Sequence, residues 1–334
     1  MPARILTTVV GSYPVPDWLA QQPTEQALRD ATAVVFHTQE LAGIDVVADG
    51  ELYRFDLNHP ETNGMIDYFV RPLTGVRTQV TRADRRALAA RGDLAFRARL
   101  AGVVEGPLGE GTLDIPRDFA RARALTRAPL KFTVTSPYML AKTLLDQHYG
   151  SLERLTAALA DLLAAQLAEF KPDVLQLDEA NLTGHPEDGV WLAPVLNRIF
   201  DRLPGHAAIH LCFGNYGGQS IQRGHWDRLI AFLNALHVDH VVAELAFRGD
   251  AELPVFRDLR PGLGLGLGVI DVKRTVVETP DEVARRLEAA VRVLGPGRVT
   301  YVHPDCGFWM LKRSIADAKM RALVLGRDRF EGRA

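Results

Sequence analysis

The chain has 334 residues, of which 47% are hydrophobic and 24% are charged, as is ordinary for a globular protein with a sizeable core. Its 39 basic and 41 acidic residues give a net charge of −2, which argues against nucleic acid and anionic membranes as partners. The two cysteines do not suggest a disulfide framework. No apolar run reaches the roughly 18–20 residues of a membrane span, and residues 1–5 lack a signal-peptide pattern. We therefore expect a cytoplasmic protein with reduced thiols.

Short apolar runs rich in β-branched residues recur along the chain, and each ends in polar or glycine-rich residues. Eight of these runs predict β-strands, at residues 5–10, 46–48, 131–135, 174–177, 208–213, 241–243, 263–270 and 299–302. Helical patterns separate most of them. They cover residues 24–42, the leucine-rich segment after the N-cap Ser151, the segment from the Thr279 capping box to Gly295, and residues 310–325.

Eight strands alternating with helices predict a parallel sheet, and eight is the number that closes a (β/α)8 TIM barrel. The alternative is an open doubly wound sheet, which would gather polar residues at a single switch point. Polar residues here follow nearly every strand, which favours the barrel. We interpret the chain as one domain over residues 1–334, with an insertion at about residues 55–130, between the second and third strands, packed over the barrel mouth.

Residues 262–268 alternate glycine and leucine, but they lack the G-x-G-x-x-G spacing of a dinucleotide site and continue as strand. We interpret this alternation as a strand with one very small face, as barrel packing can require.

The strand ending in Ile209-His210-Leu211-Cys212 carries the strongest chemical signal. Side chains alternate along a strand, so His210 and Cys212 point the same way. Cys306, the other cysteine, follows the last strand, and Glu244 follows the sixth, so a closed barrel would bring all four residues to one mouth. Two thiolates, one imidazole and one displaceable carboxylate suit Zn²⁺ and leave a position for a substrate. The alternative is two cysteines buried in an ordinary core.

Other strand ends offer groups for a substrate. Glu51 and Asp178 are carboxylates that can hold the ammonium group of a small zwitterion, unless they are simply solvated or cap helices. The turn Val10-Gly11-Ser12 offers backbone N–H groups and a hydroxyl for a carboxylate, although a tight turn also needs glycine. Lys273 and His303 lie at the same predicted mouth and are candidate proton donors or charge partners.

Motifs along the whole chain resemble the catalytic barrel of the cobalamin-independent methionine synthases, in their short, single-barrel form. The matching stretches are Thr7-Thr8-Val9-Val10-Gly11-Ser12-Tyr13-Pro14, Asp49-Gly50-Glu51 with Arg54, Leu175-Gln176-Leu177-Asp178-Glu179, His210-Leu211-Cys212, Gly268-Val269-Ile270-Asp271 and Pro304-Asp305-Cys306-Gly307. The long members of the family carry an additional N-terminal barrel, and we expect this chain to begin at the catalytic one.

The resemblance implies a (β/α)8 barrel that transfers a methyl group to homocysteine to give methionine. It implies a zinc ion held by His210, Cys212, Glu244 and Cys306. It further implies that the amino-acid thiol is bound by residues Val10, Gly11, Ser12, Glu51 and Asp178. A zinc-bound thiol is kept as the reactive thiolate near neutral pH.

Departures from the family pattern concern the methyl donor. Lys273 replaces a histidine linked to proton transfer, His303 replaces an asparagine, and the Lys-Thr-Arg that follows the family's Cys-Gly-Leu is absent after Cys306-Gly307. A methyltetrahydrofolate donor needs protonation at nitrogen, for which Lys273, His303 and Asp305 are candidates, whereas a methyl-corrinoid protein needs no acid. The lost histidine therefore favours a non-folate donor.

Two further hypotheses stay open at this stage. One is a zinc alkyltransferase that uses another thiol or donor, for example coenzyme M, although its sulfonate would need cationic partners. The other is a zinc- or thiol-binding barrel without catalytic activity.

Overall fold

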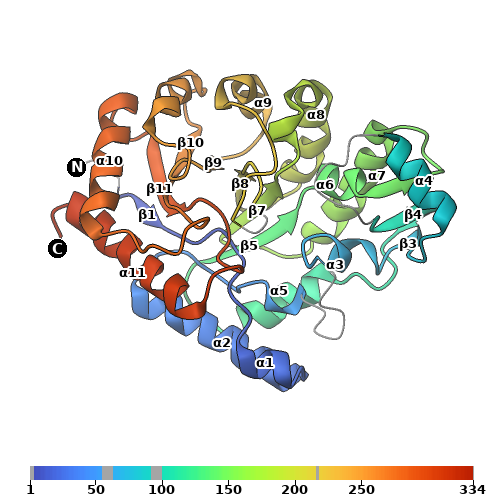
Figure 1. Cartoon of the computed structure of the whole chain (residues 1–334), viewed down its shortest axis with the longest axis horizontal. Coiled ribbons are helices and arrows are strands. Elements are labelled where there is room, and N and C mark those ends of the chain that lie inside the picture. Colours follow the sequence, from blue (N-terminus) through green and yellow to red (C-terminus); the bar gives the residue numbers. More distant parts are fainter. Residues whose placement is uncertain (1–3, 55–62, 92–99, 216–217, 334) are drawn as a thin grey trace.

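The computed structural model of the chain describes residues 4–54, 63–91, 100–215 and 218–333 (Figure 1). Eight strands form one parallel sheet in the order β1-β11-β10-β9-β8-β7-β5-β2. Their bounds are β1 (Leu6–Thr7), β2 (Val47–Ala48), β5 (Leu130–Thr135), β7 (Val174–Glu179), β8 (His206–Leu211), β9 (His240–Ala243), β10 (Gly264–Ile270) and β11 (Val299–Pro304). Each corresponds to one of the eight predicted strands.

The sheet closes on itself. Thr8, just after β1, forms an isolated parallel bridge with Val46, just before β2, so the two ends of the strand order meet. The N–H group of Val46 also donates to the carbonyl of Thr7 over 3.1 Å. The predicted TIM-barrel class is therefore confirmed, and the open doubly wound alternative is wrong. In a closed parallel barrel, the carboxyl ends of all strands share one mouth.

Helices surround the strands on the outside (Figure 1). The helices outside the insertion are α1 (Asp17–Gln21), α2 (Glu25–Ala42), α6 (Pro137–Lys142), α7 (Leu152–Leu167), α8 (Gly189–Phe200), α9 (Ile230–Ala235), α10 (Pro280–Leu294) and α11 (Arg313–Phe330), with a 3₁₀ segment, η5, at Asp250–Asp258. The expected N-caps at Ser151 and Thr279 are confirmed, including the reciprocal bonds of the Thr279–Glu282 capping box. No helix in the described ranges is long and apolar enough to cross a membrane.

The last helix begins three residues later than predicted, at Arg313 rather than residue 310, and runs on to Phe330. The residues just before Arg313, which the sequence assigns in part to the helix, form a separate turn instead. The N–H group of Phe308 donates to the carbonyl of Ser12 over 2.8 Å, and that of Leu311 donates back to Phe308. This turn ties the segment after β11 to the loop after β1, which the apolar pattern of the sequence does not reveal.

Between β2 and β5, the chain forms α3 (Asp67–Val70), β3 (Thr74–Arg77), α4 (Arg82–Arg91), β4 (Gly102–Gly109) and α5 (Ile115–Arg123). β3 and β4 pair antiparallel, and β4 pairs in parallel with β6 (Leu144–Asp146), which lies beyond β5 in the chain. Figure 1 shows this small sheet beside α7, and α4 packs against β6. Residues 55–62 and 92–99 lie outside the described ranges, so the position of the insertion over the mouth stays a prediction.

The barrel interior carries the small face predicted for the glycine-rich strand. A Cβ atom on Gly266 of β10 would lie 2.9 Å from Nε2 of His303, and one on Gly268 would lie 2.2 Å from Oδ1 of Asp305. The glycines therefore make room for the polar side chains of β11 and of the loop after it. The main hydrophobic core lies elsewhere and contains buried side chains of the strands and of the surrounding helices, such as Val35, Leu159, Leu287 and Leu323.

Candidate metal centre and substrate site

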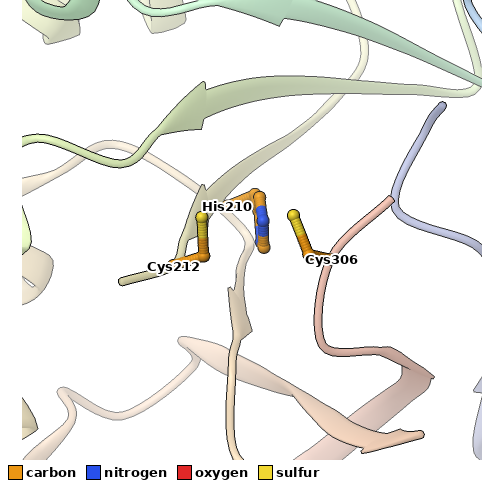
Figure 2. Close-up of side chains that lie close together, drawn as sticks. All are labelled: His210, Cys212 and Cys306. Atoms are coloured by element: carbon orange, nitrogen blue, oxygen red, sulfur yellow. The ribbon is translucent and has the colours of Figure 1, made fainter. Parts of the chain in front are cut away.

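Three potential metal ligands meet at the barrel mouth. His210 lies near the end of β8, Cys212 follows two residues later, and Cys306 follows β11. One ligand atom from each residue lies within 4.8 Å of the others. Figure 2 shows the His210 ring between the two cysteine side chains. The shared face of His210 and Cys212 follows from strand alternation, and barrel closure brings Cys306 to them.

The imidazole of His210 is held in one orientation. Its Nδ1 lies 3.1 Å from the carbonyl oxygen of Val242, and because a carbonyl only accepts, Nδ1 carries the proton. Nε2 is then a lone-pair donor, and it is buried without a hydrogen-bond partner in the described residues. A backbone carbonyl that fixes the tautomer of a histidine is the usual support of a metal ligand.

The two thiols are suited to the same ion. Hydrogen bonding from Cys212 lowers the pKa of the Cys306 thiol well below its usual value. A thiolate is the form in which cysteine binds metal. One imidazole with a free lone pair and two neighbouring thiols form a donor set typical of Zn²⁺. The residues present therefore fit the implied zinc ion.

Glu244, the fourth predicted ligand, is not part of this cluster. It follows β9 and is completely buried. Its Oε1 forms an ion pair with the Nζ atom of Lys273, and its Oε2 accepts the N–H group of Phe213 over 2.9 Å. Although burial acts against it, the negative charge of Glu244 raises the pKa of Lys273. The carboxylate of Glu244 thus lies next to the cluster, but it is paired with Lys273.

Two buried carboxylates lie on the other side of the site. Glu51 follows the turn after β2, and it is the one non-glycine residue with positive φ, at 59°, in the described part of the chain. Its Oε1 accepts the hydroxyl of Thr133 over 2.7 Å, and Arg54 lies 3.3 Å from its Oε2. Such a backbone conformation, fixed by its surroundings, is common at functional sites.

Asp178 in β7 is the second carboxylate. Its Cα pairs in register with that of His210 in β8. Oδ1 accepts the side-chain amide of Gln176 over 2.7 Å. Burial raises the pKa of Asp178 to about 7, and the negative charge of Glu51 acts in the same direction. Two buried carboxylates that disfavour each other's charge form a site for a cation.

The turn after β1 lies between these two regions. A Cβ atom on Gly11 would lie 2.0 Å from Oε1 of Glu51, and one on Gly307 would lie 1.9 Å from Oγ of Ser12. The side-chain amide of Gln176 donates to the carbonyl of Val10 over 3.0 Å. The glycine at position 11 is thus needed for close approach to Glu51, since its φ is not positive.

Besides Lys273, which is paired with Glu244, the other two candidate proton donors also have partners. The carboxylate of Asp305 accepts the N–H groups of the loop after β9, at 2.9 Å from Leu245, 2.8 Å from Ala246 and 2.7 Å from Phe247. His303 is buried in the barrel, where Nδ1 lies 2.7 Å from the carbonyl of Pro304 and burial lowers its pKa to about 3. It is therefore neutral.

Supporting residues were less visible in the sequence. Thr133 and Gln176 hold the two carboxylates, and Arg54 lies between Glu51 and the carbonyl of Thr133, to which it donates. Strand alternation was the available signal, because it places Thr133 and Gln176 on the inner face of predicted strands.

Comparison with known proteins agrees with this geometry. Residues 208–326 match the family described as "Cobalamin-independent synthase, Catalytic domain". A methionine synthase from Sulfurisphaera tokodaii is 28% identical, with 96% of this chain and 90% of the relative aligned. A methionine synthase from Thermococcus kodakarensis is also 28% identical, with 96% and 91% covered.

The fold is shared with a solved structure. A B12-independent methionine synthase from Shewanella sp. W3-18-1, in complex with selenomethionine, superposes with a TM-score of 0.83 at 24% identity, covering 99% of this chain and 98% of that one. This likeness shows the fold, while the family model covers residues 208–326 and the two relatives are 28% identical over nearly the whole chain. The chain is thus similar to the cobalamin-independent methionine synthases, and these similarities support a methyltransferase enzyme.

Proposed function

We propose that the chain transfers a methyl group to the thiol of homocysteine to give methionine, with zinc as the resident metal. One observation carries the proposal. Asp178, a member of the buried carboxylate pair, lies in register with His210, a member of the metal-ligand cluster, on neighbouring strands. A molecule that bears both an ammonium group and a thiol can therefore reach both regions at once. Relatives along nearly the whole chain bear the name methionine synthase.

The two carboxylates bind the amino group of the substrate. Glu51 and Asp178 are buried and anchored by Thr133, Arg54 and Gln176, so they offer carboxyl oxygens at fixed positions to an ammonium group. The turn of Val10, Gly11 and Ser12 contacts this pair and offers backbone N–H groups to the substrate carboxylate. These contacts orient the amino acid so that its thiol faces His210, Cys212 and Cys306.

The zinc ligands are His210, Cys212 and Cys306, with Glu244 as a fourth and exchangeable ligand. Zinc supplies the positive charge that keeps a substrate thiol deprotonated near neutral pH. His210 contributes by keeping its Nε2 lone pair free, which the carbonyl of Val242 enforces.

For the donor, we favour a methyl-corrinoid protein over methyltetrahydrofolate. The ammonium group of Lys273 is paired with Glu244, Asp305 is bound to three backbone N–H groups, and His303 is neutral. A folate donor needs a proton at nitrogen, and the partners that hold these three groups disfavour that role.

A turnover assay tests the proposal. The zinc-loaded protein is incubated with homocysteine and either methylcobalamin or methyltetrahydrofolate, and methionine is measured by mass spectrometry, with Cys306→Ser as the control. We expect methionine from the wild type, more with methylcobalamin, and none from the variant. Methylation of coenzyme M in preference to homocysteine would support the alkyltransferase alternative. A zinc-loaded protein that methylates no thiol would support the non-catalytic binding barrel.

A further inference from the structure

The Glu244–Lys273 ion pair is the most deeply buried one at the mouth, with side chains 0% and 1% exposed. Both oxygens of Glu244 are engaged, one by Lys273 and the other by the N–H group of Phe213. Lys273 is itself fixed, since its N–H group donates to Oδ1 of Asp271 over 2.8 Å and its Nζ lies 4.7 Å from the ring centroid of Phe247. The pair is therefore a defined arrangement and not a chance surface contact.

The charge balance shows why this arrangement matters. A buried carboxylate without a cationic partner is strongly destabilising, so an ionised Glu244 needs a positive charge beside it both with and without the metal. Two such partners are within its reach: Lys273, which it contacts, and the metal position. Phe213, which binds Glu244, is the residue next to Cys212, so the carboxylate is already anchored beside the cluster.

We propose that Lys273 is a positioning residue that receives Glu244 when this carboxylate leaves the metal, and so opens the fourth ligand position to the substrate thiol. The inference rests on the proposed zinc site and extends it. As the thiol enters, its proton is released to solvent and one carboxylate contact is exchanged for one thiolate contact. Glu244 then remains paired, because the ammonium group of Lys273 takes the place of the metal charge. Lys273 acts through Glu244 and does not touch the methyl donor.

The decisive variant is Lys273→Met, which keeps the length of the side chain and removes its charge. In the zinc-free protein, Glu244 loses its partner, so the melting temperature falls. In the zinc-loaded protein, Glu244 stays on the metal, so the fall is much smaller. By linkage, we expect zinc to bind at least about tenfold tighter, as measured by competition with a chromophoric chelator.

Lys319→Met is the matched control. Lys319 is also buried and paired, with Glu278 over 2.8 Å and with the carbonyls of Asp271 and Val276. It does not contact Glu244 or the ligand cluster, so its loss should lower the melting temperature equally with and without zinc. Zinc affinity should not change in this variant.

X-ray absorption at the zinc edge adds a readout that a purely structural lysine would not affect. On adding homocysteine, the wild type should exchange an oxygen ligand for a sulfur ligand. At the same homocysteine concentration, Lys273→Met should keep its oxygen ligand. The double variant Glu244→Gln/Lys273→Met removes both charges, so it should recover the stability of the zinc-free protein and lose the tighter zinc binding.

The outcomes separate the two proposals. A wild type that binds no zinc contradicts the proposed function itself. A wild type that binds zinc, together with a Lys273→Met variant whose zinc affinity is unchanged or weaker, contradicts the role of Lys273 alone. If the single variant does not fold, the double variant provides the test. A double variant whose zinc affinity and ligand exchange equal those of the wild type would contradict the proposed role of Glu244 and Lys273.

Discussion

The two sides of the barrel mouth differ in how their polar groups are paired. On the side of β8 and β11, Nε2 of His210 is buried with no partner in the described residues, beside two thiols. On the side of β2 and β7, Glu51 and Asp178 are already anchored by neighbouring side chains. The first side presents an unpartnered ligand atom to a metal ion, whereas the second presents two carboxyl groups whose positions are set by neighbouring side chains.

This difference indicates two kinds of recognition in one site. A donor set that lacks internal partners gains most of its stabilisation when the ion arrives, so metal and local stability should be tightly linked. An anchored carboxylate pair changes little on binding and selects its ligand by charge and position. Substitutions on the metal side should therefore affect zinc content, while those on the acidic side should affect thiol affinity and leave zinc content unchanged.

The largest expected effect is on zinc content in Cys212→Ser and Cys306→Ser. A serine hydroxyl is a poor zinc ligand, so each variant should retain less than about a tenth of an equivalent of zinc after dialysis against a chelator. Elemental analysis measures this, and circular dichroism checks that the barrel is still folded. Full zinc retention in both variants would contradict the assignment of the ligands.

Asp178→Asn should weaken homocysteine binding and leave zinc content unchanged. The amide keeps the shape and can still contact Gln176, but it removes one of the two charges that face the ammonium group. We expect a loss of about 2 kcal/mol, or about 30-fold in affinity, by calorimetry. A thiol without an amino group, such as mercaptopropionate, should bind both forms equally. Unchanged homocysteine affinity would remove Asp178 from the substrate site.

The pH dependence should have opposite signs for stability and for binding. The pKa of Asp178 is raised from 3.8 to about 7, so the folded protein favours the protonated acid. This contribution to stability is complete below about pH 4 and is lost as the pH rises through about 7. Homocysteine binding needs the carboxylate and should strengthen over the same upper range. Asp178→Asn should flatten both profiles, and identical profiles in the two proteins would contradict this role.

The smallest effect is expected for Gly11→Ala. Its Cβ would meet Oε1 of Glu51 at 2.0 Å, and the flexible carboxylate would have to move away. Homocysteine affinity should fall by about tenfold, with less than about 1 kcal/mol lost in stability because a side chain and not the backbone yields. Wild-type affinity in this variant would show that the position of Glu51 is not critical.

The sequence was most informative where the chemistry follows from local periodicity. Eight apolar runs indicated the strands of the closed sheet, and alternation within one run placed His210 and Cys212 on the same face. Barrel closure then accounted for Cys306. The Glu244–Lys273 pair could not be predicted, because the order of strand ends does not tell which side chain reaches which partner.

Non-local contacts explain the other differences. The small sheet joins β3 and β4 to β6, which follows β5 in the chain. Pairing between strands so far apart in the sequence cannot be recognised from the spacing of apolar residues. The start of α11 was misplaced because Phe308 is bound to the loop after β1. The proposed roles of Glu51 and Asp178 came from their residue type at strand ends, whereas their supports were visible only in three dimensions.

The most direct test of the central claim is X-ray absorption at the zinc edge of the wild-type protein, with and without homocysteine. We predict about one zinc per chain with two sulfur ligands in the free protein, and a third sulfur when homocysteine is added. That result would place the substrate thiol beside His210, Cys212 and Cys306. A zinc site whose sulfur count does not change at saturating homocysteine, or a protein that binds no zinc, would contradict the account.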